Sequence, residues 1–410
     1  MNTACSPQPF STTLTPVGSA IDDVSRLCRA LLLASLGCAA VPRPSRAPTA
    51  PVFERVRLEQ SGDAGVHTYR IPALAVATDG TLLAAFDARN DSPGDLPGNI
   101  DVMVRRSRDL GRSWSPARRV VDFDSGRGGG DPSLLVDRAT GRVFLFYEYA
   151  PPRTGIFRSD TGRDPASTGT VHPHVIWSDD HGATWQGPRD LIASLKPAGA
   201  TGMFATSGHG IQLSPRSPAP GRLLQPYAWL DTARRMHAAN AYSDDHGATW
   251  TPGASIGVGL DENKAVELAD GRVMQNIRAY EKSRTHRLVA LSRDGGITFG
   301  APVEDPQLPD PRNNADIIRV APDAPAGSRD AQMLLFSNTA DETRRVNLTV
   351  RLSCDSGRSW PVSRVVHAGP AMYSVMARLP DGTIGMLYEN GAVRGLTFVR
   401  FNLAWLGGCG

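Results

Sequence analysis

Short runs in which hydrophobic and polar residues alternate recur along this chain of 410 residues. Residues 101–106 and 347–352 are two examples, and this two-residue period predicts β-strands that bury one face. Turn sequences such as those at 78–80 and 380–382 interrupt such runs and predict hairpins. Glycine and proline, with 41 and 32 residues, are frequent enough to form many tight turns. The pattern therefore predicts an all-β protein without long helices.

One eight-residue pattern, S-x-D-x-G-x-[TS]-[WF], occurs five times, and each copy follows a predicted strand. The aspartate can accept backbone N–H bonds within a turn, and the glycine permits a positive φ. We expect the final aromatic residue to pack between neighbouring sheets. A calcium site at each copy is disfavoured, since one aspartate supplies too few oxygen ligands. The copies lie at residues 107–114, 178–185, 243–250, 292–299 and 353–360.

The spacing of these copies predicts how the sheets are repeated. Successive aspartates are 71, 65, 49 and 61 residues apart, and each interval accommodates one four-stranded sheet with its loops. Residues 52–406 would hold six sheets of roughly 59 residues, and radial closure would protect the strand edges. The prediction is one domain, a six-bladed β-propeller of four-stranded antiparallel sheets, followed by a tail at 407–410.

The first 51 residues differ from the rest. Basic residues at 26 and 29 precede an apolar run at 30–41, which is typical of a secretory signal peptide followed by a disordered linker. The run is too short to span a bilayer, which needs about 20 residues. A disordered N-terminus is the alternative, and Cys38 only loosely matches a lipoprotein cleavage site. We expect a secreted protein without integral membrane association.

Charge and cysteine content narrow the function further. The net charge is only +3, which gives no indication of nucleic-acid binding. Three of the five cysteines lie before residue 40, which leaves Cys354 and Cys409. Two distant cysteines without histidines at metal spacing form neither a zinc site nor a disulfide framework. They either pair with each other or remain buried thiols.

A second motif, Tyr-Arg-Ile-Pro at 69–72, precedes the first copy of the repeat. Together with the five repeats, which are known as Asp boxes, it resembles secreted bacterial exo-sialidases, also called neuraminidases. The segments 259–268, 308–315 and 401–406 are similar to that family as well. The resemblance implies a six-bladed propeller and a monomeric retaining exo-α-sialidase. It also implies hydrolysis of terminal sialic acids from glycans, glycoproteins or glycolipids through a covalent tyrosyl intermediate, without metal or organic cofactor.

The resemblance assigns a triad of arginines to the substrate carboxylate. Arg70 belongs to the Arg-Ile-Pro motif, Arg278 lies sixteen residues after Glu262, and Arg345 precedes the fifth box. Arg344 is the alternative to Arg345 at this position. Guanidinium groups that converge on one anion form strong, charge-assisted hydrogen bonds.

The resemblance further identifies Tyr373 as the nucleophile and Glu262 as its base. A phenol with a reference pKa of about 10 needs a base near neutral pH. A neutral phenol also avoids the repulsion that an anionic nucleophile would meet beside the substrate carboxylate. Glu267 is the competing candidate for the base, although its sequence context predicts a strand.

The remaining predicted site residues follow from the same resemblance. Asp95, in a loop rich in glycine and proline, corresponds to the acid/base that protonates the leaving oxygen. Asp91 and Asp101 are nearby alternatives for this role. Three further residues match supporting positions: Arg89 and Asp131 near the 4-hydroxyl of the sugar, and Glu389 beside the first arginine.

Other functions remain open at this point. The same site could transfer the sugar to another acceptor, or release an anhydro sugar by intramolecular attack. A non-catalytic sialoglycan-binding propeller would need the arginines but not Tyr373, Glu262 and Asp95. An Asp-box glucanase would have a carboxylate pair in place of the arginine triad.

Overall fold

A computed structural model describes residues 49–123 and 126–409, so the predicted signal peptide and Cys38 lie outside the described residues. Within these residues the regular structure is almost entirely β-strand, which confirms the predicted all-β class. The longest helices there, α1 (Ile192–Leu195) and α2 (Leu403–Leu406), have four residues each. No helix in this part of the chain combines the length and apolar character needed to cross a bilayer. Three short 3₁₀ turns complete the elements: η1 (Asp63–Gly65), η2 (Ile156–Arg158) and η3 (Asp330–Gln332).

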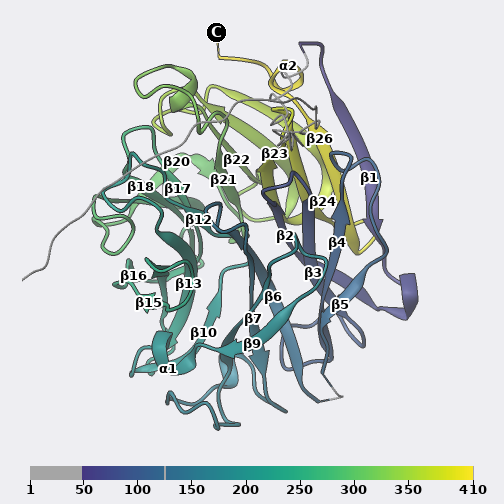
Figure 1. Ribbon diagram of the computed structural model, residues 1–410, viewed down its shortest axis with the longest axis vertical. Coiled ribbons are helices and arrows are strands. Elements are labelled where there is room, and N and C mark those ends of the chain that lie inside the picture. Colours follow the sequence, from purple (N-terminus) through teal and green to yellow (C-terminus); the bar gives the residue numbers. More distant parts are fainter. Residues whose placement is uncertain (1–48, 124–125, 410) are drawn as a thin grey trace, which may run out of the picture. The chain divides into compact units, whose positions relative to one another are not determined.

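The strands form five sheets that follow one another along the chain (Figure 1). The first contains β2 (Thr68–Val76), β3 (Leu82–Arg89), β4 (Ile100–Ser107) and β5 (Arg118–Val121). The second contains β6 (Gly128–Val136), β7 (Val143–Ala150), β8 (His172–Ser178) and β9 (Gln186–Asp190), with β11 (Gly208–His209) parallel to β6. The third contains β10 (Ala200–Ala205), β13 (Leu223–Asp231), β14 (Met236–Ser243) and the short strands β12 (Ile211–Gln212), β15 (Thr251–Pro252) and β16 (Gly257–Val258). The fourth contains β17 (Leu260–Glu267), β18 (Val273–Ala279), β19 (His286–Ser292) and β20 (Val303–Pro309).

The fifth sheet has seven strands, because one long strand belongs to two groups. Its members are β21 (Asp316–Arg319), β22 (Leu334–Thr339), β23 (Val346–Ser353), β24 (Val362–Arg378), β25 (Ile384–Asn390), β26 (Gly395–Phe401) and β1 (Phe53–Glu59). The 17-residue strand β24 pairs with β23 up to Pro370 and with β25 from Ala371 onwards. Six separate sheets were expected, and five are observed because β24 continues without a break.

The first described strand completes the last group of strands. β1 runs antiparallel to β26, so residues near 55 hydrogen-bond to residues near 400. Neighbouring sheets contact each other largely through the first strand of one of them: β2 contacts β6, β10 contacts β6, β7 and β8, β17 contacts β13, β14 and β21, and β24 contacts β2 and β21. This succession of antiparallel sheets is a β-propeller.

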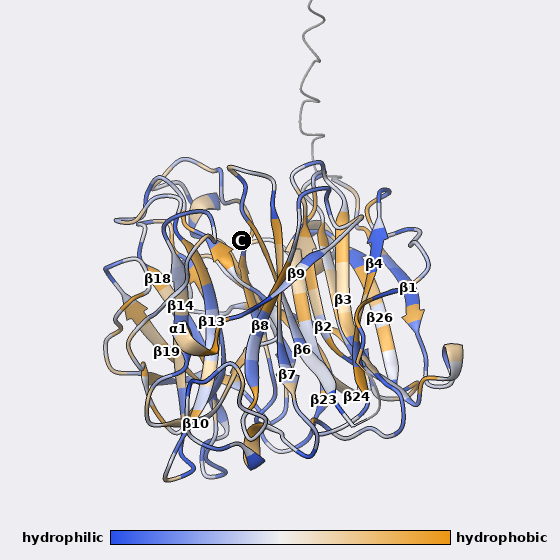
Figure 2. Cartoon of the chain, turned by 60° about the horizontal axis from the view of Figure 1, so that its bottom comes forward, coloured by the Kyte–Doolittle hydropathy of each residue, from blue (hydrophilic) through white to orange (hydrophobic). Residues whose placement is uncertain are grey.

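The core lies between adjacent sheets. Figure 2 shows the hydrophobic residues gathered in the strands and the hydrophilic ones in many of the connecting loops. Between the second and third sheets, for example, Phe144, Phe146 and Tyr227 are buried together with the box tryptophan Trp250. The Trp250 ring lies edge-on to Phe146, with 5.0 Å between centroids. Aromatic residues that close the boxes thus fill the space between sheets, where each ring buries a large apolar area.

The Asp boxes form the turns that their sequence predicts. In the second box, Asp180 accepts hydrogen bonds from Ser178 Oγ at 2.8 Å and from both the backbone N and Oγ1 of Thr184 at 2.8 and 2.7 Å. These bonds stabilise the carboxylate and lower the pKa of Asp180 to about 2. Gly182 adopts a φ of 78°, a conformation that favours glycine.

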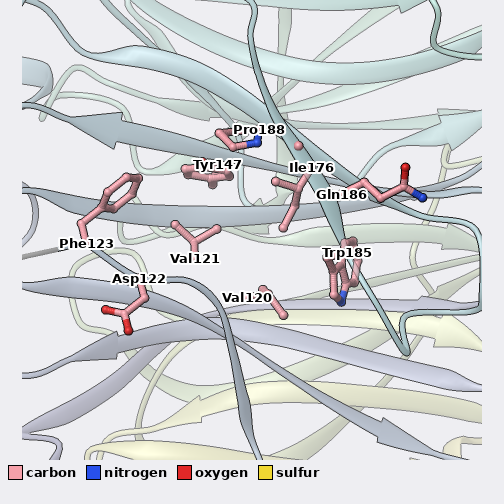
Figure 3. A pocket seen from close by; sticks show the side chains of 10 residues that line it. Val120, Val121, Asp122, Phe123, Tyr147, Ile176, Trp185, Gln186 and Pro188 are labelled. Atoms are coloured by element: carbon pink, nitrogen blue, oxygen red, sulfur yellow. The ribbon is translucent and has the colours of Figure 1, made fainter.

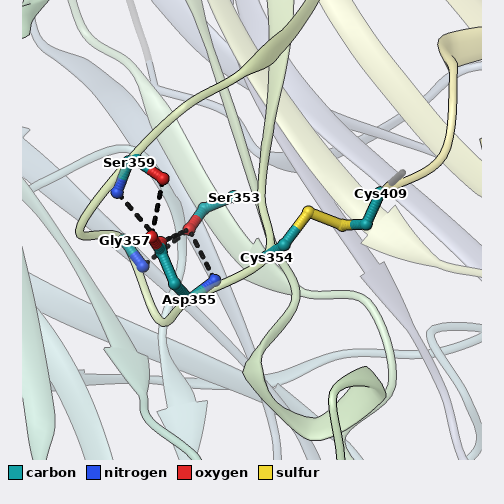
Figure 4. The surroundings of a disulfide bond; sticks show 6 residues. All are labelled: Ser353, Cys354, Asp355, Gly357, Ser359 and Cys409. Atoms are coloured by element: carbon teal, nitrogen blue, oxygen red, sulfur yellow. Dashed lines mark hydrogen bonds between the residues drawn. A yellow bond between two sulfur atoms is a disulfide. The ribbon is translucent and has the colours of Figure 1, made fainter.

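The fifth box carries a disulfide bond. Cys354 follows the box serine Ser353 and is bonded to Cys409, 55 residues further on (Figure 4). Of the two possibilities left by the sequence, the structure forms the pair rather than two free thiols. The bond connects the segment that follows α2 to the turn between β23 and β24.

Candidate active site

Register shifts interrupt the four strands β2, β6, β17 and β24 at the positions of four predicted site residues. The strand register shifts between residues 70 and 73 of β2, 130 and 133 of β6, 260 and 263 of β17, and 371 and 374 of β24. Such bulges interrupt the ladder and redirect side chains. Arg70, Asp131, Glu262 and Tyr373 all lie at or within these four segments.

Two of these bulges place a non-glycine residue in the left-handed region. Ile71 has φ 58° and Asp131 has φ 57°, and this conformation is rare for a β-branched residue such as Ile71. In both cases a buried carboxylate of a neighbouring strand accepts the backbone N–H. Ile71 N donates to Glu389 at 2.9 Å, and Asp131 N donates to Asp87 at 3.1 Å. These two carboxylates therefore help to hold the bulges in place.

Tyr373 lies at the centre of the site. Its side chain is buried, and its hydroxyl donates a hydrogen bond of 2.7 Å to Oε2 of Glu262. Arg278 Nη1 donates both to the Tyr373 hydroxyl, at 3.1 Å, and to the same Glu262 oxygen. A phenol, a carboxylate and a guanidinium thus meet within hydrogen-bonding distance, although Glu262 and Tyr373 are 111 residues apart.

The three predicted arginines converge on Tyr373. Besides Arg278 at the hydroxyl, Arg70 Cζ lies 5.4 Å and Arg345 Cζ 5.7 Å from the centroid of the Tyr373 ring. Arg344 instead pairs with Asp341 at 3.0 Å and has a side chain that is 72% exposed, so it does not belong to this group.

Each of these cations is held by its own acceptor. Arg70 Nε donates to Glu389 at 3.1 Å, and Arg278 Nε lies 3.3 Å from Asp261. Arg345 Nη2 donates to the carbonyl oxygen of residue 312 at 2.8 Å. Burial alone would lower the pKa of Arg70, but the charges of Glu389 and its neighbours outweigh this effect and raise it.

Burial raises the pKa of Tyr373, and the negative charge of Glu262 raises it further. The charges of Arg278, Arg345 and Arg70 act in the opposite direction without cancelling this rise. The phenol is therefore protonated at neutral pH. It can become a nucleophile only if a neighbouring group accepts its proton, and the atom placed to do so is Glu262 Oε2.

The alternative base is not near the phenol. Glu267 lies on the same strand, β17, but its carboxylate accepts hydrogen bonds from the backbone N and the Oγ of Ser214, at 2.8 and 2.7 Å. Both carboxylates are buried, and only that of Glu262 contacts Tyr373.

Asp95 lies in the loop between β3 and β4 and reaches the same group. Its Oδ1 is 2.7 Å from Arg89 Nη1 and 3.5 Å from Arg70 Nη1, while 73% of its side chain remains exposed. Partial desolvation of the carboxylate by the surrounding protein raises the pKa of Asp95, but the charges of Arg89 and Arg70 outweigh this effect and hold the pKa below its usual value. Of the alternatives, Asp101 binds Asn90 and Arg119, and Asp91 accepts from an asparagine side chain of the same loop.

The half-buried Asp131 lies with the buried acids Asp87 and Glu148 in the surroundings of Arg89. Asp87 binds Arg89 at 3.1 Å, and burial raises its pKa to about 7. Asp131 has its pKa raised by burial and by the charges of Asp87 and Glu148. Burial likewise raises the pKa of Glu148 to about 8, and its Oε1 has no hydrogen-bond partner. Because these carboxyl groups are close together and desolvated, they do not all ionise at neutral pH, and at least one of them can retain a proton.

Sequence reasoning missed Asp87, Glu148 and Asp261. A signal was present, because Asp87 and Glu148 are acids within otherwise apolar strands, and a buried carboxylate needs a specific partner or a bound proton. Asp261 directly precedes Glu262 near the start of a strand. Two adjacent acidic residues at such a position do not indicate burial, although both side chains are buried in the structure.

The cavities among the described residues include one beside Asp95 and one away from all the predicted site residues. One of about 400 Å³ is lined by Asp95, its neighbours in the same loop and the turn at 155–158. The other, of about 160 Å³, lies between β5 and the second sheet and is lined largely by apolar residues such as Phe123, Ile176 and Trp185 (Figure 3). None of the predicted site residues lines this second cavity.

Comparison with known proteins identifies the family of this chain. The family described as "BNR repeat-like domain" matches residues 80–386, about three quarters of the chain. This chain belongs to the BNR repeat-like family. The sialidase of Micromonospora viridifaciens is 47% identical over 362 residues, which cover 87% of this chain and 55% of that protein. A sialidase of Bacteroides fragilis is 29% identical over 362 residues, which cover 85% of this chain and 64% of that protein. The chain thus matches 55% and 64% of the lengths of these two curated relatives.

Solved structures of this kind share the fold. The Hadza microbial sialidase Hz136 superposes with a TM-score of 0.78 at 29% identity, covering 86% of this chain and 69% of that one. The intramolecular trans-sialidase from Ruminococcus gnavus, solved with oseltamivir carboxylate, has a TM-score of 0.73 at 21% identity. The match covers 86% of this chain and 98% of that chain. The second likeness concerns the fold alone.

Proposed function

We propose that this BNR repeat-like protein is a retaining exo-α-sialidase that hydrolyses terminal sialic acids through a covalent tyrosyl intermediate. The observation that carries the proposal is the Tyr373 hydroxyl, which donates to Glu262 while Arg70, Arg278 and Arg345 surround it. The relatives that are named sialidases support it.

The proposed substrate explains why this nucleophile is a phenol. Sialic acid carries a carboxylate on its anomeric carbon, and three guanidinium groups can bind that anion with charge-assisted hydrogen bonds. A carboxylate nucleophile would be repelled by the same anion. A neutral phenol approaches without repulsion, and this exception to the usual carboxylate pair is known for sialidases.

In the first step, Asp95 donates a proton to the glycosidic oxygen as the bond from that oxygen to the anomeric carbon breaks. Tyr373 Oη attacks the same carbon and passes its own proton to Glu262. In the second step, Asp95 removes a proton from water, and the water oxygen attacks the anomeric carbon. Tyr373 leaves and recovers its proton from Glu262. Two inversions at the anomeric carbon retain its configuration.

The charges around Asp95 favour this exchange of roles. In the free protein, Arg89 and Arg70 hold the pKa of Asp95 below its usual value. A substrate carboxylate bound to Arg70 neutralises part of that positive charge, so binding raises the pKa of Asp95 and favours its acid form. We propose that Arg89 and Asp131 bind sugar hydroxyls beside it and that Glu389 acts as a positioning residue for Arg70.

The wider organisation follows from the same proposal. Counting the two strand groups joined by β24 separately gives six groups, which we take as six four-stranded blades with additional short strands in the second and third. The β1–β26 pairing joins the first described strand to the last group. The propeller would comprise residues 52–406. We propose a secreted monomer, and the Cys354–Cys409 bond supports an oxidising compartment.

The test uses a fluorogenic sialoside and proton NMR of the first product released by the purified full chain. The expected product is the α-anomer of sialic acid, formed before it equilibrates. Release of the β-anomer first would refute the double displacement. An anhydro sugar would indicate intramolecular transfer instead of hydrolysis, and no release at all would leave a sialoglycan-binding propeller.

A Tyr373→Phe variant tests the nucleophile. We expect normal turnover to be abolished while the circular dichroism spectrum is unchanged, because the ring remains and only the hydroxyl is lost. Tyr227→Phe is the matched control, since Tyr227 is also a buried tyrosine and its hydroxyl has no hydrogen-bond partner. Turnover by Tyr373→Phe at the rate of Tyr227→Phe would contradict the tyrosyl intermediate.

A further inference from the structure

Two histidines and an aspartate on the second sheet bring their ligand atoms together outside the reaction centre. His172 and His174 lie on β8, and Asp190 ends the neighbouring strand β9. Residues two apart on a strand project from the same face, which explains why the two imidazoles are adjacent. One ring nitrogen from each histidine and one carboxylate oxygen all lie within 4.8 Å of one another. Neither Asp95 nor Tyr373 is among the contacts of this cluster.

The distances leave room for an ion between these atoms. His172 Nδ1 is 2.7 Å from Asp190 Oδ2, whereas His174 Nε2 is 3.8 Å from the same oxygen, too far for a hydrogen bond. Ligand atoms of a four-coordinate zinc ion with bonds of about 2.0–2.1 Å lie a little over 3 Å apart. Small side-chain adjustments would therefore make this triangle a set of zinc ligands.

Every proposed ligand is also oriented through its other polar atom. His172 Nε2 bonds the carbonyl oxygen of Ser167 at 2.8 Å, and His174 Nδ1 bonds the hydroxyl of Tyr147 at 3.1 Å. Asp190 Oδ1 accepts the backbone N–H of residue 192 at 2.8 Å. Histidines and carboxylates that bind metals are typically held in this way by outer partners. A pairing that serves only a His172–Asp190 hydrogen bond would not require His174 to be oriented as well.

We propose that His172, His174 and Asp190 form a binding site for Zn²⁺ or a similar first-row divalent ion. Two imidazoles and one carboxylate suit zinc, whereas calcium and magnesium prefer oxygen ligands. The ion replaces the hydrogen between His172 Nδ1 and Asp190 Oδ2, binds His174 Nε2, and leaves a fourth position for water. Asp190 is 21% exposed and provides the route of entry from solvent.

The site would secure the segment between β7 and β8. This segment contains Ser167, the outer partner of His172, and it also contributes residues 155–158 to the cavity beside Asp95. Gly155 lies so close to the Asp95 loop that an added Cβ would be 2.2 Å from the carbonyl oxygen of Leu96. A metal ion that fixes His172 would thus restrain a segment adjoining the acid/base loop. This inference does not depend on the proposed hydrolysis.

The test titrates ZnCl₂ into the tag-free full chain, previously treated with a chelator, by isothermal titration calorimetry. We expect saturable binding that the His174→Ala variant weakens at least about tenfold. His246→Ala is the matched control, because His246 also lies 2.9 Å from an aspartate but has no second histidine beside it. The cysteines before residue 40 can bind zinc too, so all variants are compared in the same chain.

One further variant and two further readouts distinguish the metal site from a hydrogen-bonded structural pair. Asp190→Asn keeps the shape of the side chain and should weaken zinc binding as His174→Ala does. Co²⁺ bound in place of zinc should give the visible absorption of a four-coordinate ion, which His174→Ala removes. In the parent chain, zinc should slow tryptic cleavage after Arg158 and Arg163. Zinc affinity unchanged in both variants, or no saturable binding by the parent chain, would overturn the proposal.

Discussion

Replacement of Glu262 by glutamine tests whether this carboxylate accepts the proton of the phenol. The substitution keeps the size of the side chain and leaves Arg278 with Asp261 at 3.3 Å as a counter-charge. It removes the negative charge from the atom that accepts the Tyr373 hydroxyl at 2.7 Å. The variant is therefore expected to fold and to retain the arginine cluster.

The structure predicts opposite effects on acidity and on rate. The charge of Glu262 raises the pKa of Tyr373, so the glutamine variant lowers that pKa and makes the phenol more acidic. If Glu262 acted only through its charge, the variant would equal or exceed the parent in activity. If it accepts the proton, loss of general-base catalysis lowers kcat by about 10²–10⁴-fold, or roughly 3–5 kcal/mol. We expect the decrease.

The assay is kcat and KM for a fluorogenic sialoside, measured for the parent, Glu262→Gln and Glu267→Gln. The second variant is the matched control, because Glu267 is a buried carboxylate on the same strand that binds Ser214 instead of Tyr373. It should keep kcat near the parent value. A Glu262→Gln variant that retains kcat within tenfold of the parent, with an unchanged circular dichroism spectrum, would refute a proton-accepting role for Glu262.

Three stability predictions follow from buried or constrained groups. Burial raises the pKa of Glu148 to about 8, so its carboxyl group in the folded protein is neutral at pH 5 and charged at pH 9. Glu148→Gln should therefore raise the unfolding temperature at pH 9 and change it little at pH 5. An equal effect at both pH values would contradict this assignment. Cys354→Ser opens a 55-residue loop and should lower the free energy of unfolding by up to about 4 kcal/mol. Dithiothreitol should lower the stability of the parent by a similar amount and leave that of the variant unchanged. Gly247→Ala should cost about 1–3 kcal/mol by chemical denaturation, because a Cβ at φ 79° would lie 2.2 Å from Phe144; unchanged stability would show that the box turn tolerates a side chain.

Local features of this protein could be predicted from the sequence because they are formed by local contacts. The hydrogen bonds of an Asp box join residues two and four positions apart, so the motif itself specifies its turn. Strands such as β4 and β23 follow from alternation over six or more residues. Motif positions also identified Arg70, Arg278 and Tyr373, the residues that the structure brings together.

The number of separate sheets could not be predicted in the same way. Residues 362–378 contain no glycine–aspartate turn to divide them, although Gly369 and Pro370 lie at the point where β24 changes partners. Whether a chain ends one strand there or continues it depends on pairing with both β23 and β25. These partners lie on either side of β24 in the sequence, and neither alone decides the outcome.

The sequence by itself determined the strands, the box turns and the residue types available for chemistry. Only the tertiary structure decided which of them meet: Glu262 with Tyr373 across 111 residues, Arg70 with Glu389 across 319, and β1 with β26 at the two ends of the described chain. It also decided that Asp87 and Glu148 are buried and that His174 faces Asp190. Strand alternation specifies the face on which a side chain lies, but desolvation and charge pairing depend on the elements packed against that face.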